Sequence, residues 1–423
     1  MKKLSLLIVI VAMAIFLFLS QSLSAESKYN PMLHAKANYV VNANNSPILL
    51  RCVNLSPWLN REPYLIRNNL VALFKSPSEF EQKLAQLVGV NQAEKFWQHW
   101  EESFVTENDF KHLSQQGFNC VRLPLNHKKI VVQKKNGSVT LNKAGMASVD
   151  RAVVWGQKHK IFVIIDLHTA PGGQNNLATV ADILSNDLAA RLWEGSSAKD
   201  NQKQVIQLWR EIATRYAQSR SVGGYDLLNE PKLPNGVPKT SLLRFYDKII
   251  ATIRSVDPNH MVILEGDDFA RDFSAFTSPV DHNVMFEFHE YSLFNENWNN
   301  PNQEALEPFL KVRSSFKVPL WLGEFGEGTL EWQVQMLQLM KTNQIGWAIW
   351  PWKRVYLGEG RPVIQTIQTT DAWNNLADYL LEAPFSSQPT PEQAQQGMLE
   401  MLAAIQSAHC KEDHNLAALF NKN

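Results

Sequence analysis

Short apolar segments recur along the chain, and polar or helical stretches separate them. Eight of these segments are rich in Val, Ile, Leu and Phe and have the length of β-strands. Their apolar positions are largely continuous, which is typical of strands buried on both faces, as in a parallel sheet covered by helices. The eight predicted strands are 48–55, 119–123, 161–167, 225–228, 261–264, 284–288, 320–323 and 346–350.

Amphipathic helices are predicted between these strands. One apolar face, at the spacing i, i+3, i+4, i+7, is formed by Val205, Leu208, Trp209, Ile212 and Tyr216. A second face of this kind runs through 242–253. Two helix starts are also visible, because Thr106 is a suitable N-cap and 390–393 has the form of a capping box with proline at the first helical position.

The alternation of strands and helices predicts an α/β fold, a TIM (β/α)8 barrel. A doubly wound open sheet is the rival, but no glycine-rich phosphate loop follows the first strand. We expect one catalytic domain over 30–410, followed by a tail at 411–423. Long insertions after strands one and three (58–102 and 170–200) should lie on the C-terminal face of the barrel, where active sites are built.

The N-terminus reads as a signal peptide rather than as part of the fold. Lys2 and Lys3 precede an apolar run at 4–19, and small and polar residues follow at 20–27. Residues 1–25 are therefore predicted to be the signal peptide, with cleavage after Ser24 or Ala25. An uncleaved membrane anchor is the alternative. The signal predicts a secreted or periplasmic protein.

The amino-acid composition restricts the classes of partner that we expect the protein to bind. Lys plus Arg and Asp plus Glu both number 41, so the formal net charge of zero predicts neither a nucleic acid nor a stable membrane partner. Cys52 and Cys120 lie in predicted strands, and Cys410 is the third cysteine, so we expect buried free thiols. No CxxC motif or Cys/His cluster predicts a metal site, and neither a metal nor a cofactor is expected. The protein is expected to be a monomer.

Chemically active side chains stand at the carboxyl ends of six of the eight predicted strands, where a barrel brings them together. Two are glutamates, and glycoside hydrolysis with retention needs two carboxyl groups about 5–5.5 Å apart, one as nucleophile and one as acid/base. Asp166, inside a buried strand, is expected to orient a neighbour. The candidate site residues are Arg122, His168, Asn229, Glu230, His289, Tyr291, Glu324 and Trp350.

The physical requirements suggest roles for four of these residues. Arg122 would lower the pKa of a neighbouring nucleophile and keep it ionised. Asn229 can bond a sugar 2-hydroxyl, where contacts strengthen in the transition state. The hydroxyl of Tyr291 could position the nucleophile, and Trp350 offers a flat apolar surface to a sugar ring.

These motifs resemble glycoside hydrolase family 5, the cellulase and β-glucanase family of clan A. The resemblance rests on 118–124, 166–175, 228–231, 289–291 and 323–326, which occur in the family's order between 48 and 353. It implies that Glu230 is the acid/base and Glu324 the nucleophile, and that the other candidates line the −1 sugar site.

The stretches 54–59 and 171–175 resemble the branch that contains exo-β-1,3-glucanases, although Ser56 and Pro57 replace the usual Gly-Gly. The expected function is cleavage of β-glucosidic bonds in a β-glucan by double displacement. Mannan or a glycolipid are alternative substrates. The alternative functions are an inactive glycan-binding barrel and a metal-dependent hydrolase using Asp166, His168 and His289.

Overall fold

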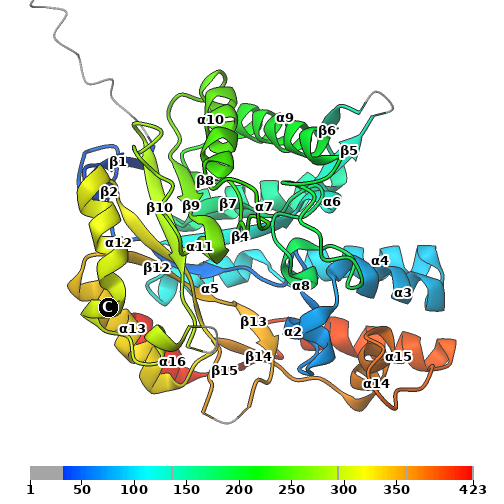
Figure 1. Ribbon diagram of the computed structural model, residues 1–423. Helices are drawn as coiled ribbons and strands as arrows, with labels where there is room; N and C mark the ends of the chain where they lie inside the picture. Colours follow the sequence, from blue (N-terminus) through cyan, green and yellow to red (C-terminus); the bar gives the residue numbers. More distant parts are fainter. Residues whose placement is uncertain (1–31, 135–136, 293–294, 359, 422–423) are drawn as a thin grey trace, which may run out of the picture. The chain divides into compact units, whose positions relative to one another are not determined.

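The computed structural model describes residues 32–421, apart from 135–136, 293–294 and 359. Eight parallel strands close into a barrel in the order β10-β11-β12-β3-β4-β7-β8-β9 (Figure 1). The predicted TIM barrel and its eight strands are therefore confirmed. The strands are β3 (Arg51–Asn54), β4 (Cys120–Asn126), β7 (Phe162–Thr169), β8 (Val222–Asp226), β9 (Val262–Glu265), β10 (Val284–His289), β11 (Leu320–Gly326) and β12 (Gly346–Trp350).

Strand β8 differs from its expected position. It was predicted at 225–228, but it spans Val222–Asp226, so Glu230 stands four residues beyond the strand end. Gly223 and Gly224 follow Val222 in this strand and carry no apolar side chains, so a pattern based on hydrophobicity does not mark them as strand residues. Glycine suits position 224, since a Cβ there would lie 3.0 Å from the carbonyl oxygen of Met261, the residue directly before β9.

Helices cover the outside of the barrel, and further helices lie within the insertions. The expected faces at 205–216 and 242–253 lie in α9 and α10, and the expected starts at Thr106 and Thr390 cap α5 and α15. The helices are α2 (Pro63–Ile66), η1 (Val71–Phe74), α3 (Pro77–Val88), α4 (Val90–Ser103), α5 (Glu107–Gln115), α6 (His127–Ile130), α7 (Lys143–His159), α8 (Ala178–Ala181), α9 (Ala198–Tyr216), α10 (Thr240–Arg254), α11 (Asp267–Ala270), η2 (Glu296–Trp298), α12 (Gln303–Phe316), α13 (Leu330–Thr342), α14 (Asp371–Leu380), α15 (Pro391–Ala404) and α16 (His414–Asn421).

The inside of the barrel is layered. Its N-terminal layer is an apolar cluster that includes Ile164, Ile263 and Met285, and Leu33 and Val40 of the hairpin β1 (His34–Lys36) and β2 (Tyr39–Val41) region pack on it. Two residues further along the same strands the inward side chains become polar, because every second residue of a strand faces the same way. The polar layer consists of Asn54, Arg122, Asp166, Asp226, Glu265 and Glu287.

Cys52 and Cys120 form a disulfide inside the apolar layer, so the prediction of free thiols was wrong for this pair. The two residues are direct register partners on the neighbouring strands β3 and β4, with their Cα atoms 4.4 Å apart. Sequence spacing of 68 residues gives no sign of this pairing, which depends on strand register. Cys410 is a free cysteine.

The C-terminal segment belongs to the fold, unlike the separate tail expected at 411–423. Strand β15 (Lys411–Glu412) completes a three-stranded sheet with β13 (Lys353–Val355) and β14 (Gln365–Ile367). Leu416 and Phe420 of α16 are buried, and the Phe420 ring lies 5.3 Å from that of Trp347. A further hairpin is formed by β5 (Val131–Gln133) and β6 (Val139–Leu141).

The predicted signal peptide at 1–25 lies outside the described residues. Within 32–421, as far as it is described, no helix has both the length and the apolar character needed to cross a membrane.

Candidate active site

A cavity of about 340 Å³ opens at the C-terminal end of the barrel strands. Its wall contains five of the eight predicted site residues, namely His168, Glu230, Tyr291, Glu324 and Trp350. The other three, Arg122, Asn229 and His289, are fully buried directly beneath it. The structure therefore brings all eight predicted residues together, although they come from six separate strand ends.

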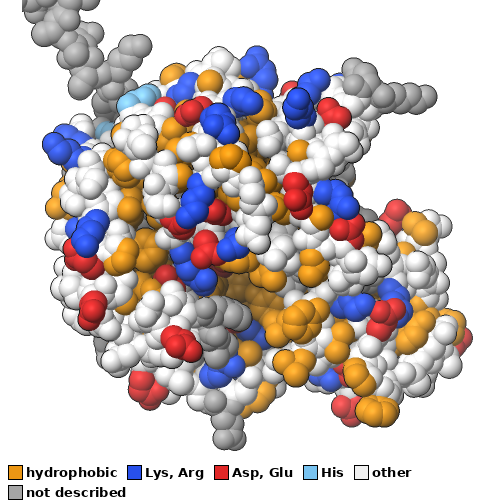
Figure 2. All heavy atoms as spheres, viewed as in Figure 1, with side chains coloured by type: hydrophobic (Ala, Val, Ile, Leu, Met, Phe, Trp, Pro, Cys, Tyr) orange, Lys and Arg blue, Asp and Glu red, His pale blue; other side chains and the backbone are white. Residues whose placement is uncertain are grey.

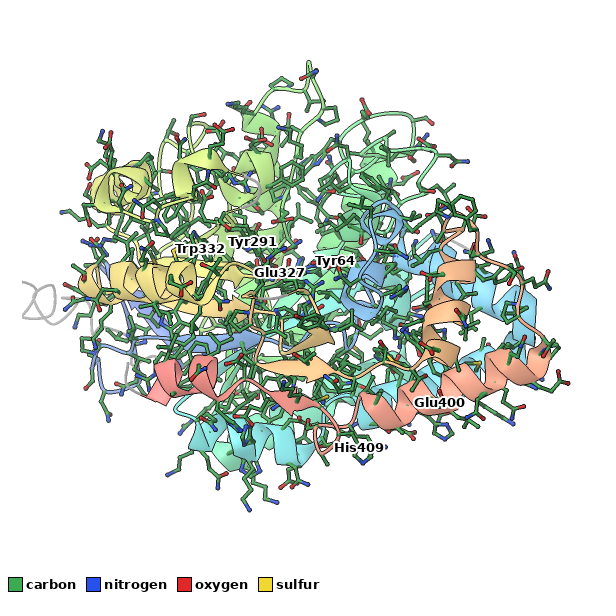
Figure 3. All side chains as sticks on the ribbon, turned by 90° about the horizontal axis from the view of Figure 1, so that it is seen from below. Tyr64, Tyr291, Glu327, Trp332, Glu400 and His409 are labelled. Carbon is green, nitrogen blue, oxygen red and sulfur yellow. A yellow bond between two sulfur atoms is a disulfide. The ribbon has the colours of Figure 1, made fainter. Side chains whose placement is uncertain are left out.

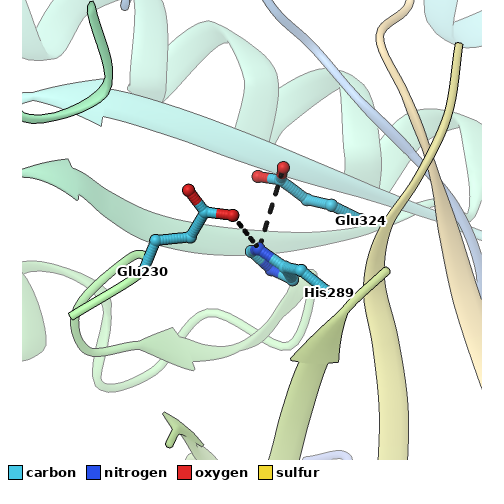
Figure 4. A group of neighbouring side chains, drawn as sticks. All are labelled: Glu230, His289 and Glu324. Carbon is cyan, nitrogen blue, oxygen red and sulfur yellow. Dashed lines mark hydrogen bonds and ion pairs between the residues drawn. The ribbon is translucent and has the colours of Figure 1, made fainter. Parts of the chain in front are cut away.

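The two glutamates face each other across the cavity. His289 lies between them, with Nδ1 3.0 Å from Glu230 Oε1 and 3.8 Å from Glu324 Oε2 (Figure 4). One carboxylate oxygen of each glutamate and one ring nitrogen of His289 all lie within 4.8 Å of one another. This separation suits a nucleophile and an acid on either side of one glycosidic bond, whereas inversion needs roughly 6.5–9.5 Å to admit a water molecule.

Glu324 is held by two donors. Arg122 Nη1 donates to Oε1 at 2.7 Å, and the Tyr291 hydroxyl donates to Oε2 at 2.8 Å. Burial nevertheless raises the pKa of Glu324 above its ordinary value, against the charge of Arg122. The expectation that Arg122 would keep this pKa low is thus not met, because burial outweighs the charge of Arg122, whose guanidinium also contacts other buried carboxyls.

Glu230 occupies a constrained backbone position. Its φ of +46° lies in the left-handed region, which is uncommon for residues other than glycine and is often found at functional sites. The backbone is fixed from both sides, since its N–H donates to Glu265 Oε2 at 2.6 Å and its carbonyl accepts from Asn175 Nδ2 at 2.9 Å. Burial raises the pKa of Glu230, as a general acid requires.

The two histidines have opposite charge states. Burial lowers the pKa of His289 to about 3, so its imidazole is neutral. Burial would also lower the pKa of His168, but the carboxylates of Asp166 and Glu62 raise it to about 10. Asp166 Oδ2 lies 2.7 Å from His168 Nδ1, which confirms that Asp166 orients a neighbour. The imidazole of His168 stacks on Trp350 with 5.4 Å between ring centroids.

Several residues of the cavity were missed by the sequence analysis. Glu62 Oε1 lies 3.1 Å from His168 Nε2, and Oε2 is buried with no hydrogen-bond partner. Tyr64 accepts a hydrogen bond from Trp350 Nε1 at 3.0 Å. Tyr64, Tyr291 and Glu327 lie close together in the view of Figure 3. Glu62 and Tyr64 follow strand β3 by several residues, and only the path of that loop brings them to the cavity.

The Glu265 carboxyl is fully buried at the end of β9 and helps to fix Glu230. With Asp166, Asp226 and Glu287 it surrounds Arg122, whose guanidinium nitrogens lie 2.8–3.3 Å from the four carboxylates. Four carboxyls around one cation cannot all be ionised at low energetic cost, so this layer retains protons at neutral pH.

Two described groups have the donors for a cation, namely Glu230, His289 and Glu324, and Glu265, Glu287 and His289. Neither is the predicted alternative set of Asp166, His168 and His289. In both groups the Arg122 guanidinium already contacts a carboxylate, at 2.7 Å from Glu324 and 3.2 Å from Glu287. A fixed positive charge in that position opposes a second cation.

Comparison with known proteins agrees with this geometry. The family model described as cellulase (glycosyl hydrolase family 5) matches residues 79–355. The chain belongs to glycoside hydrolase family 5. It is therefore a glycoside hydrolase, and the resemblance drawn from the motifs is confirmed.

Curated relatives of this family 5 chain have different named activities. A beta-xylosidase from Phanerodontia chrysosporium is 29% identical over 359 residues, which cover 76% of this chain and 71% of that protein. A probable glucan 1,3-beta-glucosidase A from Aspergillus fumigatus is 29% identical over 251 residues, 58% of this chain and 56% of that protein. The match thus spans a little over half the length of the second relative.

A solved structure supports the fold. The native form of a beta-glucanase from Saccharophagus degradans superposes with a TM-score of 0.52 over 84% of this chain and 94% of that chain, at 15% identity.

The polar layer beneath the family 5 site gives a pH prediction. Burial raises the pKa of Asp226 to about 7, against the charge of Arg122. An unfolded aspartate ionises near pH 4, so between about pH 4 and 7 the folded state holds a proton that the unfolded state has lost. The free energy of unfolding therefore falls as pH rises through this window. Relative to Asp226→Asn, we expect the wild type to lose about 2–4 kcal/mol between pH 4 and 7, measured by urea unfolding.

The control for this experiment is Asp150→Asn. Asp150 is partly exposed and accepts hydrogen bonds from Arg215, and these bonds lower its pKa against partial burial. Its contribution to stability is therefore lost as pH falls, which is the opposite sign. A parallel pH dependence of the wild type and Asp226→Asn would contradict the prediction.

Proposed function

We propose that this family 5 enzyme is a retaining β-glucosidase that cleaves β-glucosidic bonds by double displacement. The observation that carries the proposal is the close approach of Glu230 and Glu324. A carboxylate oxygen of each lies within 4.8 Å of the other and of a ring nitrogen of His289. In the first step Glu324 attacks the anomeric carbon while Glu230 protonates the departing oxygen. In the second step Glu230 takes a proton from water, which attacks the same carbon and releases Glu324.

The geometry supports this division of roles. Glu324 receives hydrogen bonds from Arg122 and Tyr291, and donors that bind the charged carboxylate favour the ionised nucleophile. Among the described residues, the Glu230 side chain has no such donor apart from the neutral His289, which suits a group that must hold and release a proton. The amide Nδ2 of Asn229 is buried beside Arg122 without a hydrogen-bond partner, as expected of a group that waits for a sugar hydroxyl.

The size of the cavity supports action on a terminal sugar. About 340 Å³ is at the lower end of the range for ligand pockets and suits one sugar ring with the first part of its leaving group. His168, Trp350 and Tyr64 close one side of the cavity, where Glu62 Oε2 also lacks a partner. A β-glucan is one substrate candidate, supported by the named activity of the glucan 1,3-beta-glucosidase relative.

Glu230→Gln tests the acid role. We expect kcat/KM for a disaccharide such as laminaribiose to fall by about 10²–10⁴-fold, because the departing sugar oxygen needs a proton. A 2,4-dinitrophenyl glucoside has a leaving group that departs without protonation, so its glycosylation step should be affected far less. Single-turnover release of dinitrophenol measures that step directly.

The matched control is Glu331→Gln, which changes an exposed carboxylate on α13. It should keep wild-type kinetics on both substrates. Equal losses on laminaribiose and the dinitrophenyl glucoside in Glu230→Gln would contradict the assignment. Failure of the wild type to release sugar from any β-glucoside or from laminarin would instead favour the inactive glycan-binding barrel.

A further inference from the structure

The mouth of the catalytic cavity is lined by apolar side chains from three separate segments. We call this set the apolar mouth: Leu73 and Phe74 of η1, Leu177 and Val180 at α8, and Phe269 in α11. Three of them are unusually exposed for their type, with Leu73 at 38%, Phe74 at 68% and Leu177 at 41%. Figure 2 shows apolar side chains gathered around the hollow beside α2 and α8. Exposed apolar groups gathered at one cavity indicate a binding surface.

Two members of the apolar mouth are anchored next to the proposed acid. Asn175 bonds both the carbonyl of Glu230 and the backbone N–H of Leu177, at 2.9 Å each. Phe269 donates its N–H to the carbonyl of Pro231 at 3.1 Å. The acid protonates the leaving-group oxygen. Side chains fixed beside Glu230 therefore flank the leaving group rather than the sugar that Glu324 attacks.

Phe269 is held by an uncommon turn. Asp268, Phe269 and Ala270 are consecutive residues with φ between +58° and +65°. Left-handed conformations are costly for residues other than glycine and persist where the surroundings enforce them. Lys232 pairs with the Asp268 carboxylate, and its ammonium lies 5.7 Å from the Phe269 ring centroid. The turn therefore places the Phe269 ring at the cavity, and its left-handed backbone conformations cost free energy.

The chemistry of the apolar mouth does not match a second sugar. Each sugar ring carries several hydroxyls that need hydrogen-bond partners when they leave water. Leu73, Leu177 and Val180 offer none. The polar groups that the cavity wall places among these apolar residues are the Thr179 hydroxyl and Arg271, which is already 3.6 Å from Glu290. A hydrocarbon group would instead cover the exposed leucines and Phe74 and gain from leaving water.

We infer that the apolar mouth binds a hydrophobic aglycone, so that the preferred substrates are β-glucosides of alkyl or other lipid-like alcohols rather than glucan chains. This inference rests on the proposed β-glucosidase activity. Glucose would occupy the closed side near Glu62, and the hydrocarbon would extend past Leu177 and Phe269 to η1.

A series of alkyl glucosides tests the inference with the full-length protein. Glucose release is measured for methyl, butyl, hexyl and octyl β-glucosides below their micelle concentrations, and for laminaribiose and cellobiose. The alcohols from butanol to octanol have nearly equal acidity, so differences report binding rather than leaving-group chemistry. We expect kcat/KM to rise about threefold per methylene group and to exceed that of both disaccharides for the octyl compound.

Two outcomes overturn the inference and separate it from the proposed function. Glucose release that is independent of alkyl length and greatest on a disaccharide leaves a β-glucosidase without an apolar aglycone site. No release from any glucoside or disaccharide refutes the β-glucosidase itself, and the inference with it.

A variant comparison locates the effect. Leu73→Gln combined with Phe74→Gln should lower the octyl-to-methyl ratio of kcat/KM by about tenfold or more, whereas a merely structural defect would lower both values alike. Leu399→Gln is the control, because Leu399 is an exposed leucine (57%) on α15, outside the lining of the cavity. It should keep the wild-type ratio. An unchanged ratio in the η1 double variant would contradict the assignment of this surface.

Discussion

Glu324→Gln is expected to lower turnover of every β-glucoside by about 10³–10⁶-fold while the protein stays folded. An amide cannot form the glycosyl ester, and unlike Glu230 this residue is needed whatever the leaving group. The loss should therefore be as large on a dinitrophenyl glucoside as on laminaribiose. Steady-state kinetics on both substrates measure it, and circular dichroism reports the fold.

The same measurement includes a check on stereochemistry. Proton NMR of the wild-type reaction should show the β-anomer of the released sugar first, since two displacements at one carbon retain configuration. Initial release of the α-anomer would contradict the double displacement. Near-normal turnover by Glu324→Gln would rule out its role as nucleophile, and the exposed Glu331→Gln again provides the reference.

Arg122→Met is expected to destabilise the fold by about 3–5 kcal/mol or more at neutral pH. Removing the guanidinium leaves the four carboxyls of the polar layer and Glu324 without their common cation. Burial already raises the folded-state pKa values of Asp226, Glu265, Glu287 and Glu324, and these pKa values would rise further above those of the unfolded chain. The deficit should therefore be smaller near pH 4.5 than at pH 7.5, because protonated carboxyls need no counter-charge. Urea unfolding at both pH values measures the difference.

Arg215→Met is the surface control for this variant. Arg215 pairs with Asp150 where both side chains are more than a third exposed, and such pairs contribute about 0–1 kcal/mol. Should Arg122→Met fail to fold at neutral pH, recovery of soluble, cooperatively unfolding protein at about pH 4.5 still tests the argument. Equal stability of Arg122→Met and wild type at pH 7.5 would show that the polar layer does not depend on this cation.

Arg122 illustrates how one side chain can stabilise the fold and also serve the chemistry. Arg122 contacts the nucleophile and also neutralises the carboxyls that lie under it. Gly323 has a related task, because a Cβ there would lie 1.6 Å from Glu287 Oε1. The glycine before Glu324 thus leaves room for a buried carboxyl of the polar layer. Mutations in this layer should consequently affect stability and activity together.

Periodicity and strand-end chemistry were sufficient to predict the barrel and the eight clustered site residues. Hydrophobic runs locate strands because burial on both faces requires continuous apolar sequence. In a parallel barrel all carboxyl ends meet at one face, so Arg122, Glu230 and Glu324 could be placed together without knowledge of distances. The order of the family motifs added the roles of the two glutamates.

Other features depend on the register and on the loops. The Cys52–Cys120 disulfide exists because two strands far apart in sequence align these residues, which composition does not reveal. Glu265 follows the predicted strand 261–264 and Glu287 lies within the predicted strand 284–288, and only the closed barrel turns both inward beside Arg122. The segment 411–421 lacked any signal of its own, and its docking rests on the surface offered by β14 and Trp347.

The sequence by itself therefore determined the fold class, the pair of glutamates and the bond type to be tested. Only the tertiary structure decided what surrounds the pair: the buried Glu265 carboxyl that fixes Glu230, the Glu62 carboxylate on the closed side, and the apolar mouth at η1, α8 and Phe269. The physical reason is the difference between strands and loops. Strand positions follow from a short-range pattern of burial, whereas loop paths depend on many weak long-range contacts that no local pattern records.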